Sequence, residues 1–327
     1  MDQTHQLCLS VGKPGVPSLT VSDDGARGML DLRNLETFVW VARLTSFRAA
    51  AEKLNTTQPA ISTRIATLER DLGTRVFDRR ARKVVLTPKG AELLGYAERM
   101  LALRSEMMRV VGDPASMQGS LRLGAPDTIA HTWLAELVDR ISAAYPSVSL
   151  EVDVDSTPDL RRNLLSGKLD IAFLGEHAGD PTLKSRPLCS YRLGWFIGEK
   201  LVSSKRRFTL ADVTRWPVIT FRRGSAPHLA VRRLLTSSGF AEARVFGSSS
   251  IAGIVRMAVD GIGICILPPA VVTRELASRQ LRRLPLAHDL PPIDFFVAYP
   301  AKPENYLAAA VAELAVATAR AHPDSPK

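Results

Sequence analysis

The most informative pattern of hydrophobic and polar positions in the chain lies between residues 46 and 70. After Ser46, four apolar positions recur at helical spacing; they are Phe47, Ala50, Ala51 and Leu54. Asn55 and Thr56 interrupt this pattern, and Thr57 followed by Pro59 has the composition of a new helix start. The apolar positions of this second helix are Ile61, Ile65 and Leu68. The pattern therefore predicts two short helices that are joined by a tight turn and pack through their apolar faces.

The second helix leaves polar and basic side chains away from its apolar face. They are Gln58, Ser62, Thr63 and Arg64. Glutamine and serine hydrogen-bond base edges in a DNA major groove, and arginine bonds guanine or phosphate. An ordinary helix pair with a solvated polar face would show the same pattern, so this stretch alone leaves both interpretations open.

The flanking sequence favours DNA binding. Upstream, a further amphipathic helix is predicted from Leu32, Leu35, Phe38, Val39 and Ala42. Downstream, apolar residues at 76–77 and 84–86 enclose the charged run 78–83, which predicts a β-hairpin wing with a basic tip. Between residues 64 and 90 there are eight basic and three acidic side chains. A basic wing beside a polar helix face is typical of DNA-binding modules, although a solvated charged loop has the same composition.

Residues 32–101 as a whole resemble the winged helix-turn-helix of the LysR-type transcriptional regulators. The resemblance rests on the stretches LETFVWVARLTSFRAAAEKL, TQPAISTRIATLERDLGTRVFDR and VVLTPKGAELL. It implies an α/β protein in which an N-terminal winged helix-turn-helix and a linker helix are joined to a two-lobed, periplasmic-binding-protein-like domain. It also implies a DNA-binding transcriptional regulator whose second domain binds a small metabolite effector.

The predicted DNA-binding residues combine the helix face, two helix caps and the wing. They are Ser46, Thr57, Gln58, Pro59, Ser62, Thr63, Arg64, Arg79, Arg80, Arg82 and Lys83. We expect Gln58 and Ser62 to contact bases, and the wing to contact phosphates or the minor groove. Many members of the family have arginine where this chain has Thr63, so its base preference does not follow from the resemblance. The resemblance further implies a dimer of dimers that bends double-stranded promoter DNA at an interrupted inverted repeat and lets RNA polymerase be recruited.

A long helix with a broad apolar stripe is predicted from Pro88 to about Val111. Its apolar side chains are Leu93, Leu94, Ala97, Met100, Leu101, Leu103, Met107 and Met108. Such a wide stripe favours packing against the same helix of a second subunit, although packing on its own winged domain is the alternative. Asp113–Pro114 and Gly119 mark a hinge after this linker helix.

Beyond the hinge, strand patterns alternate with helix patterns. The predicted strands are 121–123, 148–154, 169–174, 193–196, 218–221 and 295–299, and the predicted helices are 129–144, 158–165, 227–236, 250–259 and 303–319. Such alternation indicates parallel α/β construction. The stretches YPSVSLEV, LLSGKLDIAFL and VDGIGICILPP resemble the LysR effector domain, which extends the resemblance over nearly all of the chain after residue 29.

These patterns divide the chain into four parts. The winged helix-turn-helix is expected at 29–87, the linker helix and hinge at 88–119, and the effector domain at 120–320. Within the effector domain, lobe II is expected at about 191–265, with the chain returning to lobe I around 261–268. Residues 1–28 show no sustained periodicity and no secretory signal pattern, which predicts a disordered tail or a translation start at Met29.

Three predicted helix starts in the effector domain have hydroxyl or acidic caps. Together with the end of one lobe II strand, they supply the candidate effector-binding residues, which are Asp127, Thr128, Ser156, Thr157, Phe221, Arg222, Ser248 and Ser249. Free N–H groups at helix starts and a nearby arginine favour a small organic carboxylate. Asp127 would repel a carboxylate but pair with an amine, so amino acids are also candidates. Simple helix capping beside a solvated arginine is the alternative.

Charge, apolar content and cysteine number narrow the classes of protein to which this sequence can belong. The net charge of +10 favours a polyanionic partner, and no apolar run is long enough to cross a bilayer. Three cysteines, Cys8, Cys189 and Cys265, form neither a disulfide framework nor a zinc motif. We find no nucleophile–base pair and no metal-ligand spacing, so we expect no cofactor and no enzyme activity. A secreted solute-binding protein is disfavoured by the fused winged helix, and we expect a cytoplasmic protein.

Overall fold

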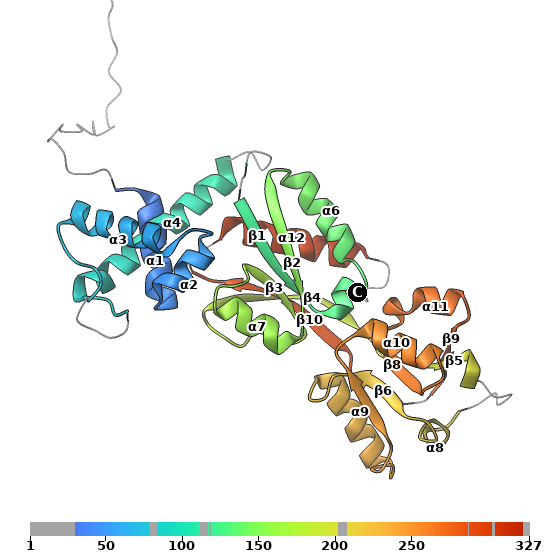
Figure 1. Cartoon of the computed structure of the whole chain (residues 1–327). Helices are drawn as coiled ribbons and strands as arrows, with labels where there is room; N and C mark the ends of the chain where they lie inside the picture. Colours follow the sequence, from blue (N-terminus) through green and yellow to red (C-terminus); the bar gives the residue numbers. More distant parts are fainter. Residues whose placement is uncertain are drawn as a thin grey trace, which may run out of the picture.

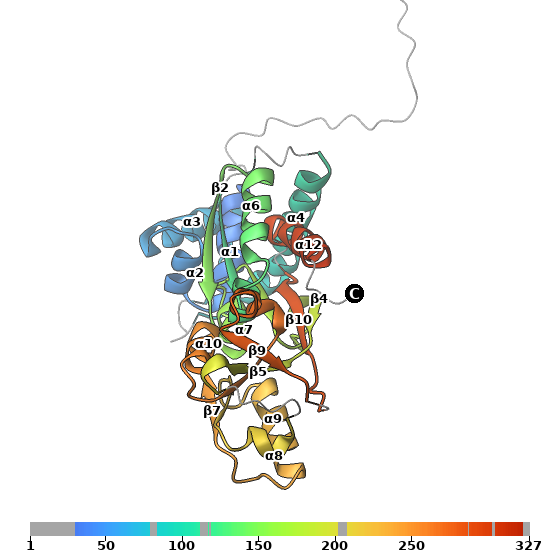
Figure 2. The ribbon, with the colours of Figure 1, turned by 90° about the vertical axis from the view of Figure 1, so that its right-hand side faces the viewer.

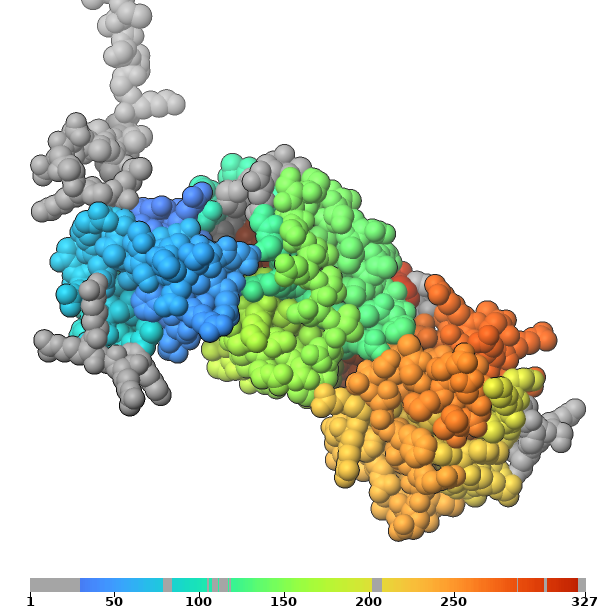
Figure 3. Space-filling view, in the orientation of Figure 1, coloured from blue at the N-terminus to red at the C-terminus, as the bar shows by residue number. Residues whose placement is uncertain are grey.

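The computed structural model describes residues 30–78, 84–111, 117, 119–201, 208–286, 288–302 and 305–322. Three parts follow one another in space: a helical N-terminal domain, lobe I and lobe II (Figures 1 and 2). The N-terminal domain contacts lobe I on the side away from lobe II, as the space-filling view shows (Figure 3). The predicted tail at 1–28 and the hinge dipeptide Asp113–Pro114 lie outside the described residues.

The N-terminal domain has the predicted order of helices. They are α1 (Leu32–Leu44), α2 (Phe47–Lys53), α3 (Gln58–Leu72) and the long α4 (Pro88–Val111). The first three begin at side-chain caps, and α3 ends at Gly73, whose φ of 64° suits glycine. Phe38, Ile61 and Leu68 are fully buried between the helices. The helix-turn-helix predicted from the apolar spacing is therefore confirmed.

The described base of the wing is a short antiparallel contact. Phe77 and Leu86 form a β-bridge, and the backbone N–H of Asp78 donates to the carbonyl oxygen of Val85 at 2.8 Å. The predicted basic tip is outside the described residues; its members are Arg79, Arg80, Arg82 and Lys83. The base of the hairpin is thus observed, and the position of its tip stays a prediction.

Lobe I is a five-stranded sheet in the order β2-β1-β3-β10-β4. The strands are β1 (Gly119–Ala125), β2 (Val148–Val154), β3 (Ile171–Leu174), β4 (Leu183–Tyr191) and β10 (Ile293–Pro300). The helices are α5 (Asp127–Ala130), α6 (Leu134–Ala144), α7 (Thr157–Leu165) and α12 (Tyr306–Ala321). Apolar residues of α6 and α12 pack on one face of the sheet, and those of α7 pack on the other. Both faces are covered, which explains why β3 is entirely apolar.

Lobe II is a second five-stranded sheet in the order β7-β6-β8-β5-β9. Its strands are β5 (Gly194–Gly198), β6 (Val218–Phe221), β7 (Val245–Ser248), β8 (Ile264–Leu267) and β9 (Leu281–Leu284). Its helices are α8 (Leu210–Val213), α9 (Ala226–Ser237), α10 (Ile251–Val259) and α11 (Thr273–Ala277), with short 3₁₀ turns at Glu199–Leu201 and Pro269–Val271. One face packs against α8 and α9, and the other against α10 and α11.

The structure corrects three expectations about the lobes. Lobe II does not end near residue 265, because β8 pairs with β5 and β6 and the chain continues through β9 before returning. The sheets are mixed and not purely parallel, since β10 runs antiparallel to β3 and β4, and β5 runs antiparallel to β8 and β9. The helix predicted at 129–144 is two helices, with a turn at 131–133 between them.

Among the described residues, no helix combines the length and the apolar character that a bilayer-spanning segment requires.

Candidate DNA-binding face and interlobe cleft

Helix α3 presents a polar face at its N-terminal end. The Oγ1 atom of Thr57 accepts a hydrogen bond from the backbone N–H of Ala60 at 3.4 Å, and Pro59 lies in the first turn, where its missing N–H costs nothing. The apolar face holds α3 against α1 and α2, so the opposite side is left in solvent. Its exposed residues include Thr57, Gln58, Pro59, Ser62 and Thr63.

Besides Thr57, two further predicted DNA-binding residues hydrogen-bond to backbone groups of neighbouring residues. The Oγ atom of Ser46 accepts from Ala49 N at 3.2 Å as the cap of α2, and Thr63 Oγ1 donates to the carbonyl oxygen of Pro59 at 3.0 Å. Arg64 is half-buried. Within the described part of the chain, the side chains of Gln58 and Ser62 make no hydrogen bond, so both have their donors and acceptors available for a ligand.

The wing is anchored to α3 by a residue that the sequence analysis did not single out. The Oε1 atom of Glu69 accepts a hydrogen bond from Val76 N at 2.9 Å, and Thr87 N donates to the carbonyl oxygen of Val76 at 3.0 Å. The Thr87 hydroxyl donates to the carbonyl oxygen of Arg75 at 2.8 Å. These bonds fix the base of the wing beside α3.

The two lobes meet at the start of α10. Asp127, the first residue of α5, accepts a hydrogen bond from the backbone N–H of Ile251, the first residue of α10, with an Oδ2–N distance of 2.5 Å. An N–H in the first turn of a helix has no intrahelical acceptor and lies at the positive end of the helix dipole. The other carboxylate oxygen of Asp127 lies 3.4 Å from Nε2 of His131. Asp127 therefore fills an anion-binding position between the lobes.

A second polar contact crosses between the lobes. Nη1 of Arg222, just after β6, lies 3.4 Å from Oδ2 of Asp159 in α7. The Ser156 hydroxyl, which caps α7, donates to the same oxygen at 2.5 Å. The hydrogen bonds from Ser156 and Arg162, with the nearby charge of Arg222, lower the pKa of Asp159 below its usual value. This carboxylate is thus held ionised opposite the arginine.

The other predicted effector residues lie near these two contacts, and two of them form hydrogen bonds within their own lobe. Thr157 Oγ1 accepts from Gly175 N at 2.9 Å, and Ser248 Oγ accepts from Ser250 N at 3.1 Å. Ser250 in turn caps α10 by accepting from Gly253 N at 3.2 Å. Thr128 is buried, Phe221 is half-buried between the two lobe cores, and Ser249 is exposed.

The structure brings the predicted residues together in pairs across the lobes. Asp127 lies at the helix start that Ser248 and Ser249 precede, and Arg222 reaches the helix that Ser156 caps. Asp159 was missed, although Ser156 and Asp159 have the S-x-x-D spacing of a capping box. No local signal identifies the Ile251 N–H, because its role depends on the approach of Asp127 from the other lobe.

A groove of about 570 Å³ lies beside the Asp127 contact, between the α5–α6 turn and the helices α10 and α11. Its polar lining includes His131, Thr132, Arg256, Arg274 and Gln280. None of the eight predicted effector residues lines it. The groove is therefore distinct from the contacts that the predicted effector residues make between the lobes.

The described residues hold no cluster of three or more histidine, cysteine, aspartate or glutamate side chains with the geometry of a metal site. Cys189 and Cys265 are free thiols, and burial raises the pKa of both to about 12. Such thiols are protonated at neutral pH and react poorly. Cys8 lies outside the described residues.

Comparison with known proteins gives this arrangement a family. The profile of the bacterial regulatory helix-turn-helix domain of the lysR family matches residues 32–91, and the profile of the LysR substrate binding domain matches residues 114–320. The second match alone spans more than half of the chain. The chain belongs to the LysR family.

Individual relatives agree with this assignment. The LysR-type regulator is 28% identical to the HTH-type transcriptional regulator CzcR of Bacillus thuringiensis over 74% of this chain and 82% of that protein. It is 26% identical to the regulator GltR of Bacillus subtilis over 77% of this chain and 84% of that protein.

Solved structures share the fold. A full-length OxyR variant from Pseudomonas aeruginosa matches with a TM-score of 0.60 at 20% identity, over 91% of this chain and 97% of that one. ArgP from Mycobacterium tuberculosis matches with a TM-score of 0.59 at 22% identity, over 91% of this chain and 100% of that one. The protein is thus a DNA-binding transcriptional regulator with an effector-binding domain, and not an enzyme.

Proposed function

We propose that this LysR-type regulator reads promoter DNA with the N-terminal face of α3 and senses a small organic carboxylate or an amino acid between its lobes. The observation that supports the effector class is the hydrogen bond from Ile251 N to the carboxylate of Asp127. A helix start that already holds one carboxylate has the chemistry to hold another. Arg222 adds a cation at the same boundary.

In the proposed DNA complex, exposed side chains of α3 enter the major groove. Gln58 and Ser62 contact bases, and the other predicted members of the DNA-binding set position the domain on the backbone. The basic residues of the wing tip contact phosphates. The first experiment is a gel-shift titration on the DNA upstream of the gene, with an unrelated fragment as competitor.

Two substitutions separate base contacts from phosphate contacts. We expect Ser62→Ala to reduce discrimination between operator and random DNA by about 1 kcal/mol or more, because a base-edge hydrogen bond is lost. Arg82→Ala is expected to weaken binding to all sequences and to lower the salt slope by about one. Titrations of both variants at several salt concentrations measure these effects. Equal losses on operator and random DNA for both variants would contradict this division.

The effector class is tested on Asp127. Asp127→Asn keeps an oxygen that can accept from Ile251 N but removes the charge that would pair with an amine. We expect affinity for amino acids to fall about tenfold while affinity for simple carboxylates is unchanged or higher. Calorimetric titration of a matched panel of carboxylates, amides and amino acids measures this. Asp139→Asn, an exposed change on α6, is the control, and equal effects of both variants would overturn the proposed role of Asp127.

Helix α4 supports a proposed dimer. Ala97 and Leu101 pack on the N-terminal domain, but a second row is exposed; it comprises Tyr96, Met100, Leu103, Met107 and Val111. Leu103 is 67% exposed, so this row needs a partner other than its own domain. We further propose that two such dimers form a tetramer on cytoplasmic promoter DNA, where effector binding alters the bend and the recruitment of RNA polymerase.

Leu103→Glu is therefore expected to convert the protein to a smaller oligomer, because it places a charge in the proposed helix–helix interface. Light scattering after size-exclusion chromatography measures the mass. Gly95→Glu adds the same charge on α4 where nothing lies within 4 Å of the new Cβ, and it is expected to leave the mass unchanged. An unchanged mass for Leu103→Glu would exclude α4 as the main interface.

A further inference from the structure

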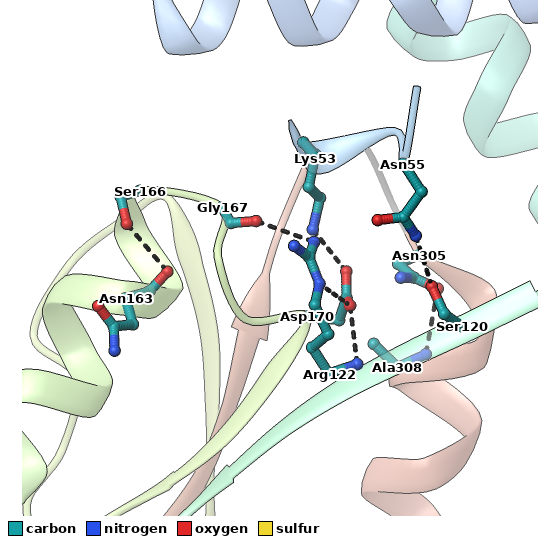
Figure 4. Close-up of polar contacts among 10 residues, drawn as sticks. All are labelled: Lys53, Asn55, Ser120, Arg122, Asn163, Ser166, Gly167, Asp170, Asn305 and Ala308. Carbon is teal, nitrogen blue, oxygen red and sulfur yellow. Dashed lines mark hydrogen bonds and ion pairs between the residues drawn. The ribbon is translucent and has the colours of Figure 1, made fainter. Parts of the chain in front are cut away.

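A cluster of three charged residues, Lys53, Asp170 and Arg122, joins the helix-turn-helix to lobe I. The ammonium group of Lys53, the last residue of α2, lies 2.5 Å from Oδ1 of Asp170, which precedes β3 (Figure 4). The two residues are 117 positions apart in sequence. Their side chains are only 6% and 7% exposed, so this ion pair is enclosed where the two domains meet.

The second oxygen of Asp170 is held by lobe I itself. Arg122 in β1 donates to Oδ2 from its backbone N–H at 2.9 Å and from Nε at 3.2 Å. Its Nη2 donates to the carbonyl oxygen of Gly167 at 3.0 Å (Figure 4). Arg122 therefore fixes the Asp170 carboxylate in lobe I through Oδ2, while Oδ1 pairs with Lys53.

Neighbouring contacts enclose the lysine on the side of the N-terminal domain. Its Nζ lies 4.7 Å from the ring centroid of Trp40 in α1.

A second polar contact joins the two domains. Asn55, in the turn between α2 and α3, donates from Nδ2 to the Ser120 hydroxyl at the start of β1, at 3.1 Å (Figure 4). Asn55 is only three positions before Gln58, so lobe I contacts the turn that precedes the recognition helix.

The cluster lies at one end of strands β1 and β3, and the proposed effector site between the lobes, which we call the interlobe cleft, lies at the other end. Strand β1 carries Arg122 and leads to Asp127, while β3 follows Asp170 and leads to Gly175, which bonds Thr157. The strands are parallel neighbours in the sheet, so we expect a shift at their C-terminal ends to reach the end that holds the charged cluster. The charges also regain hydration on separation, which offsets part of the attraction within the buried pair.

We propose that Lys53, Asp170 and Arg122 form a latch that docks the helix-turn-helix on lobe I of the same chain and couples the recognition helix to the cleft. The docking part stands independently of any effector, and the coupling part rests on the proposed effector site. Lys53 is a positioning residue in this proposal and contacts no DNA. Its loss leaves Arg122 and Asp170 paired within lobe I.

The docking is tested by a distance measurement on the full-length protein. Spin labels are placed at Ala66 on α3 and Ser142 on α6, two exposed sites, in a chain whose native cysteines are replaced by alanine. Labelled protein is diluted with unlabelled protein to suppress distances between subunits. We expect one narrow distance in the parent and at least a twofold broader distribution in Lys53→Met. Arg48→Met is the control, because it removes a charge from α2 at a side chain 82% exposed. A parent-like distribution in Lys53→Met would overturn the latch.

Cross-linking tests whether the contact is made within one chain. Asn55→Cys and Ser120→Cys in the same background are joined by a short bismaleimide. A monomer-mass product that forms at least fivefold more slowly with Lys53→Met supports the latch, whereas a dimer-mass product assigns the contact to two subunits and overturns it.

The coupling is tested with DNA and effector on the same variant. We expect Lys53→Met to bind the operator and the effector, with the effector changing operator affinity less than twofold. A parent-sized effector response in Lys53→Met would overturn coupling through the latch. Failure of the parent to bind any carboxylate or amino acid would instead refute the proposed effector class and leave the distance measurement valid.

Discussion

Asp170→Asn is expected to lower the free energy of unfolding by about 3–5 kcal/mol, because it leaves Lys53 and Arg122 without their buried counter-charge. Asparagine has nearly the same volume, so the loss would not arise from packing. Chemical denaturation followed by circular dichroism measures the change. Asp260→Asn, which removes a more exposed carboxylate paired with Arg256, is the control and is expected to cost about 1 kcal/mol or less.

The same substitution has a defined pH dependence. Burial alone would raise the pKa of Asp170, but the charge and hydrogen bond of Lys53, with the hydrogen bond from Arg122, hold it below the usual 3.8. A lowered pKa in the folded state stabilises the protein above the unfolded value, and this contribution is lost as the pH falls through the folded value. The difference between parent and Asp170→Asn is therefore expected to shrink as the pH falls below about 4. A neutral-pH difference smaller than that of the control would contradict the buried charge cluster.

Gly90→Ala is expected to destabilise the N-terminal domain by about 3 kcal/mol and to abolish operator binding at moderate temperature. A Cβ at this position in the first turn of α4 would lie 2.1 Å from the carbonyl oxygen of Val76 and 3.1 Å from Cδ2 of Leu86. Both atoms belong to the base of the wing, and a backbone oxygen cannot move aside cheaply. The substitution therefore forces α4 away from the wing.

Gly95→Ala provides the matched control for Gly90→Ala, since nothing lies within 4 Å of the added Cβ on the same helix. Alanine at this helix position is expected to stabilise by about 0.5–1 kcal/mol. Thermal unfolding and gel-shift titration of both variants measure the contrast. Similar behaviour of the two variants would show that the close approach of α4 to Val76 does not constrain the domain.

Helix α3 was predictable because its signals are local. Thr57, Pro59 and Gly73 mark its beginning and end, and Ile61, Ile65 and Leu68 define its buried face within one stretch of chain. The missed strands β4, β7 and β9 lack such signals. Strand β4 contains Pro187 beside an irregular register, and β9 carries two exposed arginines between two buried leucines. All three lie at the edge of a sheet and lack the regular apolar alternation that made the edge strand β2 predictable.

Long-range pairing also explains the misplaced end of lobe II. Gly194 pairs with Leu267 and Trp195 with Leu284, and no local pattern specifies these partners. The same holds for the candidate sites. Lys53 and Asp170 each have the appearance of a solvated charge in sequence, and only the fold brings them together. By contrast, the helix caps at Ser156 and Ser250 were visible, because a cap is defined by the residues next to it. The cap expected at Asp127 is not observed, since Asp127 is the first residue of α5 and its side chain bonds Ile251 N in lobe II.

The hydrogen bond between Asp127 and Ile251 N has a consequence for sensitivity. An anion that binds this helix start must displace a carboxylate tethered to the same molecule, and a tethered group competes at a fixed high local concentration. At the proposed effector site, Asp127 would therefore act as an internal competitor of the effector. Under this proposal, the strength of that internal bond would set the metabolite level at which the protein responds, and substitutions at Asp127 would shift this level without altering the proposed DNA-binding residues.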